Sequence, residues 1–261
     1  MSEPRIPFEL SPGQCAVYER EGLLRLPQAV DPGAAAAMAD VLWRAMERRF
    51  GARPGVPETW TVRHPSGLGA AGRLGAFAAM ASPVVTSVLD QLLGPDWIRP
   101  ARWGVPLVTF PERAEWNVPH AQWHLDTPAM PSDPAIARVF LLLAPLRPRG
   151  GGTLTVAGSH LLFRTLARKE GRAMRSVEAK KRLLTEQDWF AQLSSPGHAG
   201  IRIRSFMEEG ATIDGAEVRV VEMTGEAGDV YFMHPSLLHV PSSNASKSPR
   251  LMLTQWIDGK G

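Results

Sequence analysis

The sequence predicts a mainly β protein with a helical layer at its N-terminus, and three observations support this. Signals that start and stop helices are concentrated in the first fifty residues. From about residue 97 the chain changes to short β-branched or aromatic runs bounded by Gly, Pro, Asn and Asp, which is typical of an antiparallel sandwich or barrel. At 261 residues the chain can also bury a substantial core. We therefore expect a single domain over residues 1–261.

Two helices are expected before residue 52, with a short strand between them. Ser11 is suited to cap the first helix, and Gln14 three residues later completes a capping box. The stretch GLLRLPQAV that follows predicts the strand. Asp31 is a second N-cap, and the Ala-, Met- and Leu-rich helix after it is expected to end at Gly51.

Residues 52–95 continue this N-terminal region with a less regular pattern. Gly and Pro are frequent over residues 52–75, so we expect a loop there. The stretch LGAFAAMASPVVTSVLDQLLG then predicts two helices interrupted near Pro83. Residues 1–95 are therefore expected to form a mainly helical elaboration of the β core.

The β core itself is expected over residues 97–257. Its predicted strands lie, in order, in WIRPARWGVPLVTFP, AQWHLDTP, AIARVFLLLAPL, GTLTVAGSH, AEVRVVEMT, GDVYFMHP and RLMLTQWID. Residues 164–193 interrupt this series with a helical pattern that is expected to break at Gly171. The prediction is thus a β core with one helical insertion.

Composition narrows the classes of function. The formal net charge of +3 and the pI near 9.3 are too mild to predict nucleic-acid binding. The single cysteine, Cys15, excludes an internal disulfide framework and indicates a reducing compartment. The N-terminus lacks a signal-peptide pattern, and no apolar run approaches the roughly 18 residues that a membrane span needs. We expect a cytoplasmic protein that binds neither membrane nor nucleic acid.

The stretch HAQWHLDTPAM, residues 120–130, contains the side chains most capable of binding a metal. If this segment is extended, His124 and Asp126 point to the same face, with His120 in phase. His234 and His239 are the candidates for a third ligand. Two imidazoles and one carboxylate leave coordination positions open, as in non-haem Fe(II) oxygenases. An isolated H-x-D pattern is a weak signal of metal binding, so the prediction of a metal site depends on the rest of the chain.

Three segments together resemble a known family. WHLD, then GGTLTVAGSH, then GDVYFMHPSLLHVPSSNASKSPR resemble, in order, the blocks of the phytanoyl-CoA dioxygenase-like branch of Fe(II)/2-oxoglutarate oxygenases. The N-terminal helix, strand and helix are similar to the usual opening of that branch. The resemblance is thinnest over residues 52–95 and 164–215. It implies a double-stranded β-helix core, also called a jelly roll or cupin-like fold, with Fe(II) as metal and 2-oxoglutarate as cosubstrate.

Carried over by position, the resemblance assigns roles to individual residues. His124, Asp126 and His239 would be the iron triad. Arg250, eleven residues beyond His239, would pair with the distal carboxylate of 2-oxoglutarate. A guanidinium suits this role because its planar fork binds a carboxylate through two hydrogen bonds. Phe140 falls where the family often has an aromatic side chain facing the cosubstrate.

The chain departs from the family at one cosubstrate position. Members commonly have a small hydroxyl residue two positions after the second histidine, but here Pro241 stands there, followed by Ser242 and Ser243. Ser242 is the candidate replacement, and Thr153 at the end of the GGT block is a candidate polar contact.

The remaining candidates each have a structural and a functional interpretation. His234, before a proline at the end of a predicted strand, is expected to make structural hydrogen bonds rather than bind metal. His120 is either a group on the substrate side or a loop histidine. Trp116 and Trp123 are either core residues or part of a substrate cavity.

The resemblance implies an oxygenase that hydroxylates or otherwise oxidises an unactivated C–H bond of a small organic substrate, releasing succinate and CO2. Asp126 favours hydroxylation over halogenation, because related halogenases replace the carboxylate with a small residue. One alternative is a non-catalytic jelly roll whose metal serves structure or ligand sensing. A metal-dependent hydrolase is a further alternative, but no general base is evident beside the triad.

Residues 164–182 carry eight cations against Glu170 and Glu178, a local net charge of +6. One interpretation is a solvated helical face. The other is a lid whose Arg and Lys side chains attract a substrate that is anionic or linked to a phosphate-bearing thioester carrier.

Overall fold

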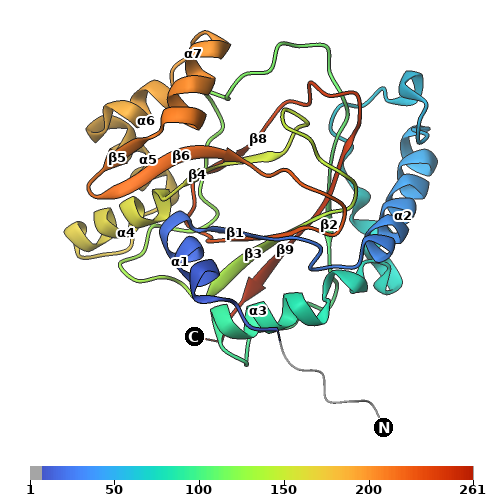
Figure 1. The fold of residues 1–261 in the computed structure, drawn as a ribbon, viewed down its shortest axis with the longest axis horizontal. Coiled ribbons are helices and arrows are strands. Elements are labelled where there is room, and N and C mark those ends of the chain that lie inside the picture. The colour runs from blue at the N-terminus through green and yellow to red at the C-terminus, as the bar shows by residue number, and fades with distance from the viewer. Residues whose placement is uncertain (1–7, 261) are drawn as a thin grey trace.

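Two antiparallel sheets form the centre of the protein, and the computed structural model describes residues 8–260. The strands are β1 (Leu23–Leu26), β2 (Val105–Thr109), β3 (Ile136–Leu142), β4 (Thr153–Ala157), β5 (Ala211–Ile213), β6 (Ala216–Glu222), β7 (Val230–Met233), β8 (His239–Pro241) and β9 (Arg250–Asp258). The larger sheet has the order β1-β7-β3-β9-β2 and the smaller one β5-β6-β4-β8. This arrangement confirms the predicted mainly β core of the double-stranded β-helix type (Figure 1).

The N-terminal helices form as their capping signals predict. They are α1 (Pro12–Glu21), α2 (Pro32–Phe50) and α3 (Pro83–Leu93). Ser11 and Gln14 form the expected capping box, Asp31 accepts from the backbone of α2, and Gly51 ends α2 in the left-handed conformation.

Between α2 and α3 the chain is less regular than a pair of helices. It forms three short 3-10 segments, η1 (Pro57–Thr59), η2 (Leu68–Gly75) and η3 (Ala78–Met80). The prediction of an α-helix before Pro83 was therefore wrong, and so was that of a plain loop over residues 52–75. The three glycines at 69, 72 and 75 lower helix propensity there, and short 3-10 turns satisfy the backbone instead.

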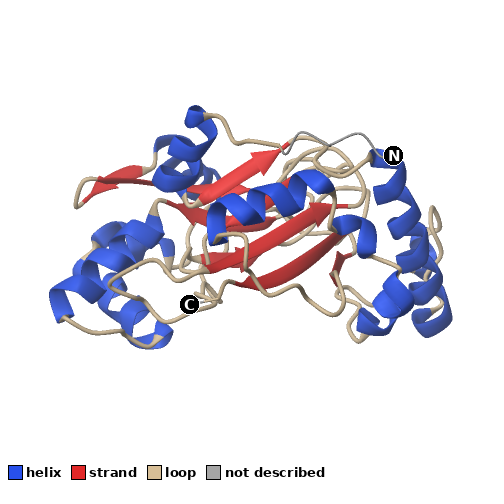
Figure 2. Cartoon of the chain, turned by 90° about the horizontal axis from the view of Figure 1, so that it is seen from below, coloured by secondary structure: helices blue, strands red, loops and turns tan. Residues whose placement is uncertain are grey.

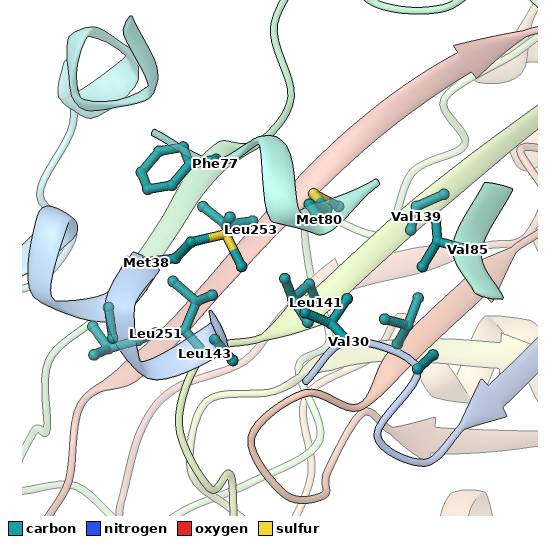
Figure 3. Close-up of a cluster of buried hydrophobic side chains, with 14 of the residues drawn as sticks. Val30, Met38, Phe77, Met80, Val85, Val139, Leu141, Leu143, Leu251 and Leu253 are labelled. Atoms are coloured by element: carbon teal, nitrogen blue, oxygen red, sulfur yellow. The ribbon is translucent and has the colours of Figure 1, made fainter. Parts of the chain in front are cut away.

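Alternate residues of β3 and β9 pack against the N-terminal region. Val139 and Leu141 of β3 and Leu251 and Leu253 of β9 are buried in one cluster. Met38, Phe77, Met80 and Val85 close it from the helical side (Figure 3). Because side chains alternate along a strand, the residues between these face the other sheet.

The helical insertion covers the outer face of the smaller sheet. It comprises α4 (Ser159–Glu170), α5 (Ser176–Glu186), α6 (Asp188–Leu193), α7 (Ala199–Ile203) and the π-helical segment η4 (Arg204–Glu209). It lies on the opposite side of the strands from α2 (Figures 1 and 2). Gly171 ends α4 in the left-handed conformation, as expected. The helical region begins earlier than residue 164, however, because the strand predicted in GTLTVAGSH stops at Ala157.

Two further strand predictions were too long. Residues 97–104 have no strand, and β2 begins only at Val105. The segment AQWHLDTP contributes a single β-bridge, between His124 and His239. Proline follows Thr127 and limits extension of the ladder there. Among residues 8–260, no helix combines the length and apolar character that a membrane crossing requires.

Candidate active site

The structure brings His124, Asp126 and His239 together, although they come from distant segments. The first two lie in the connection between β2 and β3, and His239 begins β8. The backbones of His124 and His239 exchange two N–H···O hydrogen bonds of 3.0 Å each. One ligand atom from each of the three residues lies within 4.8 Å of the others. The arrangement is a compact N, N, O donor set.

Backbone carbonyls fix the orientation of both imidazole rings. Nδ1 of His124 lies 3.0 Å from the carbonyl oxygen of Gln122, and Nδ1 of His239 lies 2.9 Å from that of Leu237. A carbonyl oxygen only accepts, so each Nδ1 carries the proton and each Nε2 is left as a potential ligand atom. Burial lowers the pKa of His239 to about 4, although Asp126 opposes this. Its ring is therefore neutral at pH 7, as ligation requires.

Asp126 completes the donor set with an oxygen that has an ion-pair partner but no hydrogen bond. Its Oδ2 is buried and accepts no hydrogen bond from residues 8–260, and the Nη1 of Arg138 lies 3.5 Å away. Oδ1 lies 3.7 Å from Nε2 of His239. A buried carboxylate oxygen that accepts no hydrogen bond is costly, and a divalent cation held between it and the two imidazoles would satisfy it. The donor set therefore fits Fe(II).

Arg138 also lies at the metal site, although the sequence motif did not predict it there. Its Nε donates a 2.9 Å hydrogen bond to Oγ1 of Thr254, which holds the guanidinium beside Asp126. The available signal was its position on β3, two residues before Phe140 and hence on the same face.

Arg250 is buried with incomplete compensation of its charge. Nη1 donates to the carbonyl of Gly151 at 2.8 Å, whereas Nε finds no hydrogen-bond partner in the described part of the chain. Burial lowers the pKa of Arg250 to about 10, opposed by the charge of Glu222, so it stays protonated at pH 7. Glu222 itself accepts from the backbone N–H groups of Arg149 and Gly152. A buried guanidinium with a free donor fits an anionic ligand such as the distal carboxylate of 2-oxoglutarate.

The other residues predicted near the cosubstrate are all buried. Phe140 is on the inner face of β3, in register with Thr254, and Thr153 of β4 is in register with Pro241. The hydroxyl of Ser242 donates to the carbonyl of Gly152 at 2.8 Å. Ser242 thus has a backbone partner already.

The predicted substrate residues fall into different environments. His120 is exposed, ahead of the triad. Trp116 and Trp123 are both buried in the apolar cluster beneath the insertion. Trp123 donates from Nε1 to the carbonyl of Pro119 at 2.8 Å, whereas Nε1 of Trp116 donates to no residue that the structure describes. These placements favour packing for Trp123 and leave a polar donor available on Trp116.

His234 lies outside the triad and makes other polar contacts. Its Nδ1 accepts from the backbone N–H of Ser236 at 3.2 Å, so Nε2 carries the proton and faces Asp133 at 3.4 Å. This contact is the main reason that the pKa of Asp133 falls to about 2. The ring of His160 lies beside that of His234, with 4.8 Å between centroids.

The insertion braces the segment that carries His124 and Asp126. The buried guanidinium of Arg202 donates to five backbone carbonyls, two before the triad and three in the insertion (Val118, Pro119, Gln192, Leu193 and Ser195). Lys180 of α5 donates to the carbonyl of Trp123 at 2.9 Å. Ala129 and Met174 exchange two backbone hydrogen bonds. The insertion therefore holds the ligand segment from one side, in addition to the bridge between His124 and His239 of β8.

The cations of the basic segment 164–182 also make contacts within the fold. Acidic side chains pair with many of its cations: Arg164 with Asp133, Lys169 with Asp214, Arg172 with Glu178, and Arg182 with Glu170 and Glu186. Arg168 donates to the carbonyl of Pro131. Glu170 and Glu178 are already counted in the local charge of +6, and the outside partners Asp133, Asp214 and Glu186 offset three further positive charges, which weakens the ability of the segment to steer an anion.

The chain is similar to known proteins both in sequence and in fold. The model of the phytanoyl-CoA dioxygenase (PhyH) family matches residues 18–252. The chain belongs to this family. Phytanoyl-CoA dioxygenase-family proteins are Fe(II)- and 2-oxoglutarate-dependent enzymes, and this chain is accordingly one of them, with iron as its metal and 2-oxoglutarate as its cosubstrate. No curated protein sequence matches significantly.

Solved structures agree with the fold of the phytanoyl-CoA dioxygenase family. The non-haem α-ketoglutarate-dependent carbocyclase SnoK from nogalamycin biosynthesis is 17% identical, with a TM-score of 0.62 over 98% of this chain and 87% of its own. EctD from S. alaskensis is 18% identical, with a TM-score of 0.54 over 99% and 80%. HygX from Streptomyces hygroscopicus, solved with nickel and 2-oxoglutarate, is 16% identical, with a TM-score of 0.53 over 97% and 88%.

Proposed function

We propose that this enzyme hydroxylates an unactivated C–H bond of a small organic molecule. The balanced reaction takes R–H, 2-oxoglutarate and O2 to R–OH, succinate and CO2. The observation that carries the proposal is the N, N, O donor set, which is accompanied by a buried arginine, Arg250, whose Nε finds no hydrogen-bond partner among the residues the structure describes. When bound, iron and 2-oxoglutarate together activate O2 for attack on the C–H bond.

The residues of the chain have distinct tasks in this proposal. His124, Asp126 and His239 hold the metal on one side and leave positions open for cosubstrate and O2. Arg250 binds the distal carboxylate of 2-oxoglutarate and so sets its orientation. Arg138 holds the Asp126 carboxylate in place from the larger sheet.

Two observations bear on the outcome of the reaction. Asp126 occupies the carboxylate position, which favours hydroxylation because a halogenase needs that space for a halide. SnoK is described as a carbocyclase and the structurally similar SnoN as an epimerase, so this fold also supports other oxidative outcomes. Product analysis must therefore distinguish R–OH from a cyclised or epimerised product.

The substrate is proposed to be a free small molecule. Many cations of segment 164–182 are paired with acidic side chains or backbone carbonyls, so the insertion gives little support to a phosphate-bearing carrier. His120 and Trp116 are the proposed contacts on the substrate side, because the first is exposed and the second keeps an unpartnered Nε1 donor.

The test is a screen of candidate substrates for Fe(II)-dependent conversion of 2-oxoglutarate to succinate. We expect a productive substrate to raise succinate formation and to gain one oxygen atom, which ¹⁸O2 would label. If a substrate raises succinate formation but its product contains no oxygen from O2, the reaction is another oxidation and not a hydroxylation. An absence of any Fe(II)-dependent succinate formation would contradict the oxygenase.

A further inference from the structure

The family motif leaves one cosubstrate contact unassigned in this chain. Pro241 stands where members commonly carry a hydroxyl side chain, and a proline side chain donates no hydrogen bond. Ser242, the next hydroxyl, donates to the carbonyl of Gly152 at 2.8 Å and lies 3.3 Å from that of Ser243. Since a hydroxyl has a single proton, that of Ser242 is already in use.

A different hydroxyl lies buried and without a partner at the end of β2. Thr109 is fully buried, and its Oγ1 has no hydrogen-bond partner within residues 8–260. Its backbone carbonyl, by contrast, accepts from Asn244 Nδ2 at 3.0 Å. An unsatisfied buried hydroxyl costs roughly 1–3 kcal/mol, so it calls for an explanation.

The strand register places this hydroxyl beside Arg250. Thr109 and Arg250 are directly opposite each other in the antiparallel pairing of β2 with β9. Opposite residues of such a pair have side chains on the same face, with Cβ atoms about 4.5–5.5 Å apart. Nε of Arg250 likewise lacks a hydrogen-bond partner among the described residues. Two free donors, one of them charged, therefore lie side by side on neighbouring strands.

We propose that Thr109 is a cosubstrate-binding residue, whose hydroxyl donates to the distal carboxylate of 2-oxoglutarate alongside Arg250. A carboxylate has about four acceptor positions on two oxygens, so it can bind a guanidinium and a hydroxyl together. In this chain the hydroxyl comes from β2 rather than from the position after the second histidine. The inference rests on the proposed function, because it assumes that Arg250 binds that carboxylate.

Neighbouring threonines fit this role less well. Thr254 already accepts from Nε of Arg138 at 2.9 Å and lies four residues further along β9 than Arg250. Thr155 has its hydroxyl 3.5 Å from the carbonyl of Val221. Thr109 combines full burial, a free hydroxyl and direct register with Arg250.

The test is the Thr109→Val variant, which keeps the shape of the side chain and removes only the hydroxyl. We expect the Kd for 2-oxoglutarate to rise about tenfold or more, as for loss of a hydrogen bond to a charged group. Thermal stability without cosubstrate should be unchanged or higher, because the substitution removes an unsatisfied buried polar group. If the hydroxyl had only a structural role, Thr109→Val would instead lower thermal stability and leave the Kd for 2-oxoglutarate unchanged.

The measurement is an anaerobic titration of the Fe(II)-loaded protein, first with 2-oxoglutarate and then with pyruvate. Pyruvate has the 2-oxo acid end but lacks the distal carboxylate, so its weaker binding should be the same in parent and variant. Thr109→Ser should bind 2-oxoglutarate like the parent. Thr86→Val, the same substitution on α3, should also leave the affinity unchanged.

Two results would overturn the assignment. The first is that Thr109→Val binds 2-oxoglutarate with parental affinity, and the second is that it loses affinity for 2-oxoglutarate and pyruvate in equal measure. In the first case, selective weakening of 2-oxoglutarate binding in Ser242→Ala would assign the contact to Ser242 instead. If the Fe(II)-loaded parent itself fails to bind 2-oxoglutarate, the proposed function fails, and the titration of the parent reveals this before any variant is measured.

Discussion

Lys180 of α5 donates a hydrogen bond to the carbonyl of Trp123, the residue immediately before the proposed iron ligand His124. The helical insertion therefore reaches the metal site through the backbone of the ligand segment. Lys181, its neighbour in sequence, is exposed. This pair offers a direct comparison between a bracing and a solvated cation.

We expect Lys180→Met to loosen the segment around His124, whereas Lys181→Met should have no effect. The reason is that only the first substitution leaves the buried carbonyl of Trp123 without its donor. Hydrogen exchange of residues 120–127 measures the effect. Equal exchange in the two variants would show that Lys180 does not brace the ligand segment.

Arg202 should be one of the most sensitive positions for stability. Arg202→Met leaves five carbonyls without their donor, so we expect the free energy of unfolding to fall by about 3 kcal/mol or more. Urea unfolding measures this. Arg204→Met, two residues away at an exposed position, is the matched control and should change stability by less than about 0.5 kcal/mol. Similar losses of unfolding free energy in both variants would contradict the role assigned to Arg202.

Arg250→Lys should separate cosubstrate binding from metal binding. Lysine keeps the charge but loses the planar fork, so the concentration of 2-oxoglutarate needed for half-maximal turnover should rise by roughly one to two orders of magnitude. Iron affinity should barely change. If calorimetry shows unchanged 2-oxoglutarate affinity in Arg250→Ala, another cation holds the carboxylate, and Arg138 beside Asp126 is the first to examine.

Acid should destabilise the protein through His160. Burial, together with the neighbouring His234, lowers the pKa of His160 to about 3, against roughly 6.5 when unfolded. Between these values the unfolded chain binds the extra proton, so stability falls as pH falls below about 6.5. The contribution is up to about 1.4 kcal/mol per pH unit. Thermal unfolding from pH 7 to pH 4 should show a shallower slope for His160→Gln, and an unchanged slope would contradict this assignment.

The paired cations of the insertion should contribute little to turnover. Arg172 and Arg182 are exposed and are paired with acidic side chains, and such surface pairs contribute about 0–1 kcal/mol. We expect Arg172→Gln combined with Arg182→Gln to show the same salt dependence of turnover as the parent. A large loss at low salt that recovers at high salt would restore the interpretation of this segment as a steering lid, because exposed charges are screened more strongly as salt rises.

Local signals made much of the fold predictable. The capping box of Ser11 and Gln14 and the left-handed end at Gly171 depend on neighbours a few residues away, and both formed as predicted. The family motif likewise allowed the prediction that His124, Asp126 and His239 lie together.

Contacts that depend on register or tertiary packing were not predictable in this way. The pairing of Thr109 with Arg250 is set by how β2 aligns with β9, and no local pattern specifies that alignment. Arg202 contacts carbonyls more than eighty residues earlier in the chain. Strand lengths were overestimated at residues 97–104 because aromatic and apolar residues also occur in packed loops.

The most direct test of the metal centre is an anaerobic absorption titration of the protein with Fe(II) and then 2-oxoglutarate. We predict a metal-to-ligand charge-transfer band that needs both components, and that is lost in His124→Ala, Asp126→Ala and His239→Ala while each variant stays folded. His234→Ala, which removes a buried histidine outside the triad, should keep the band. A parent protein that binds iron but gives no band with 2-oxoglutarate, or an undiminished band in Asp126→Ala, would contradict the proposed centre.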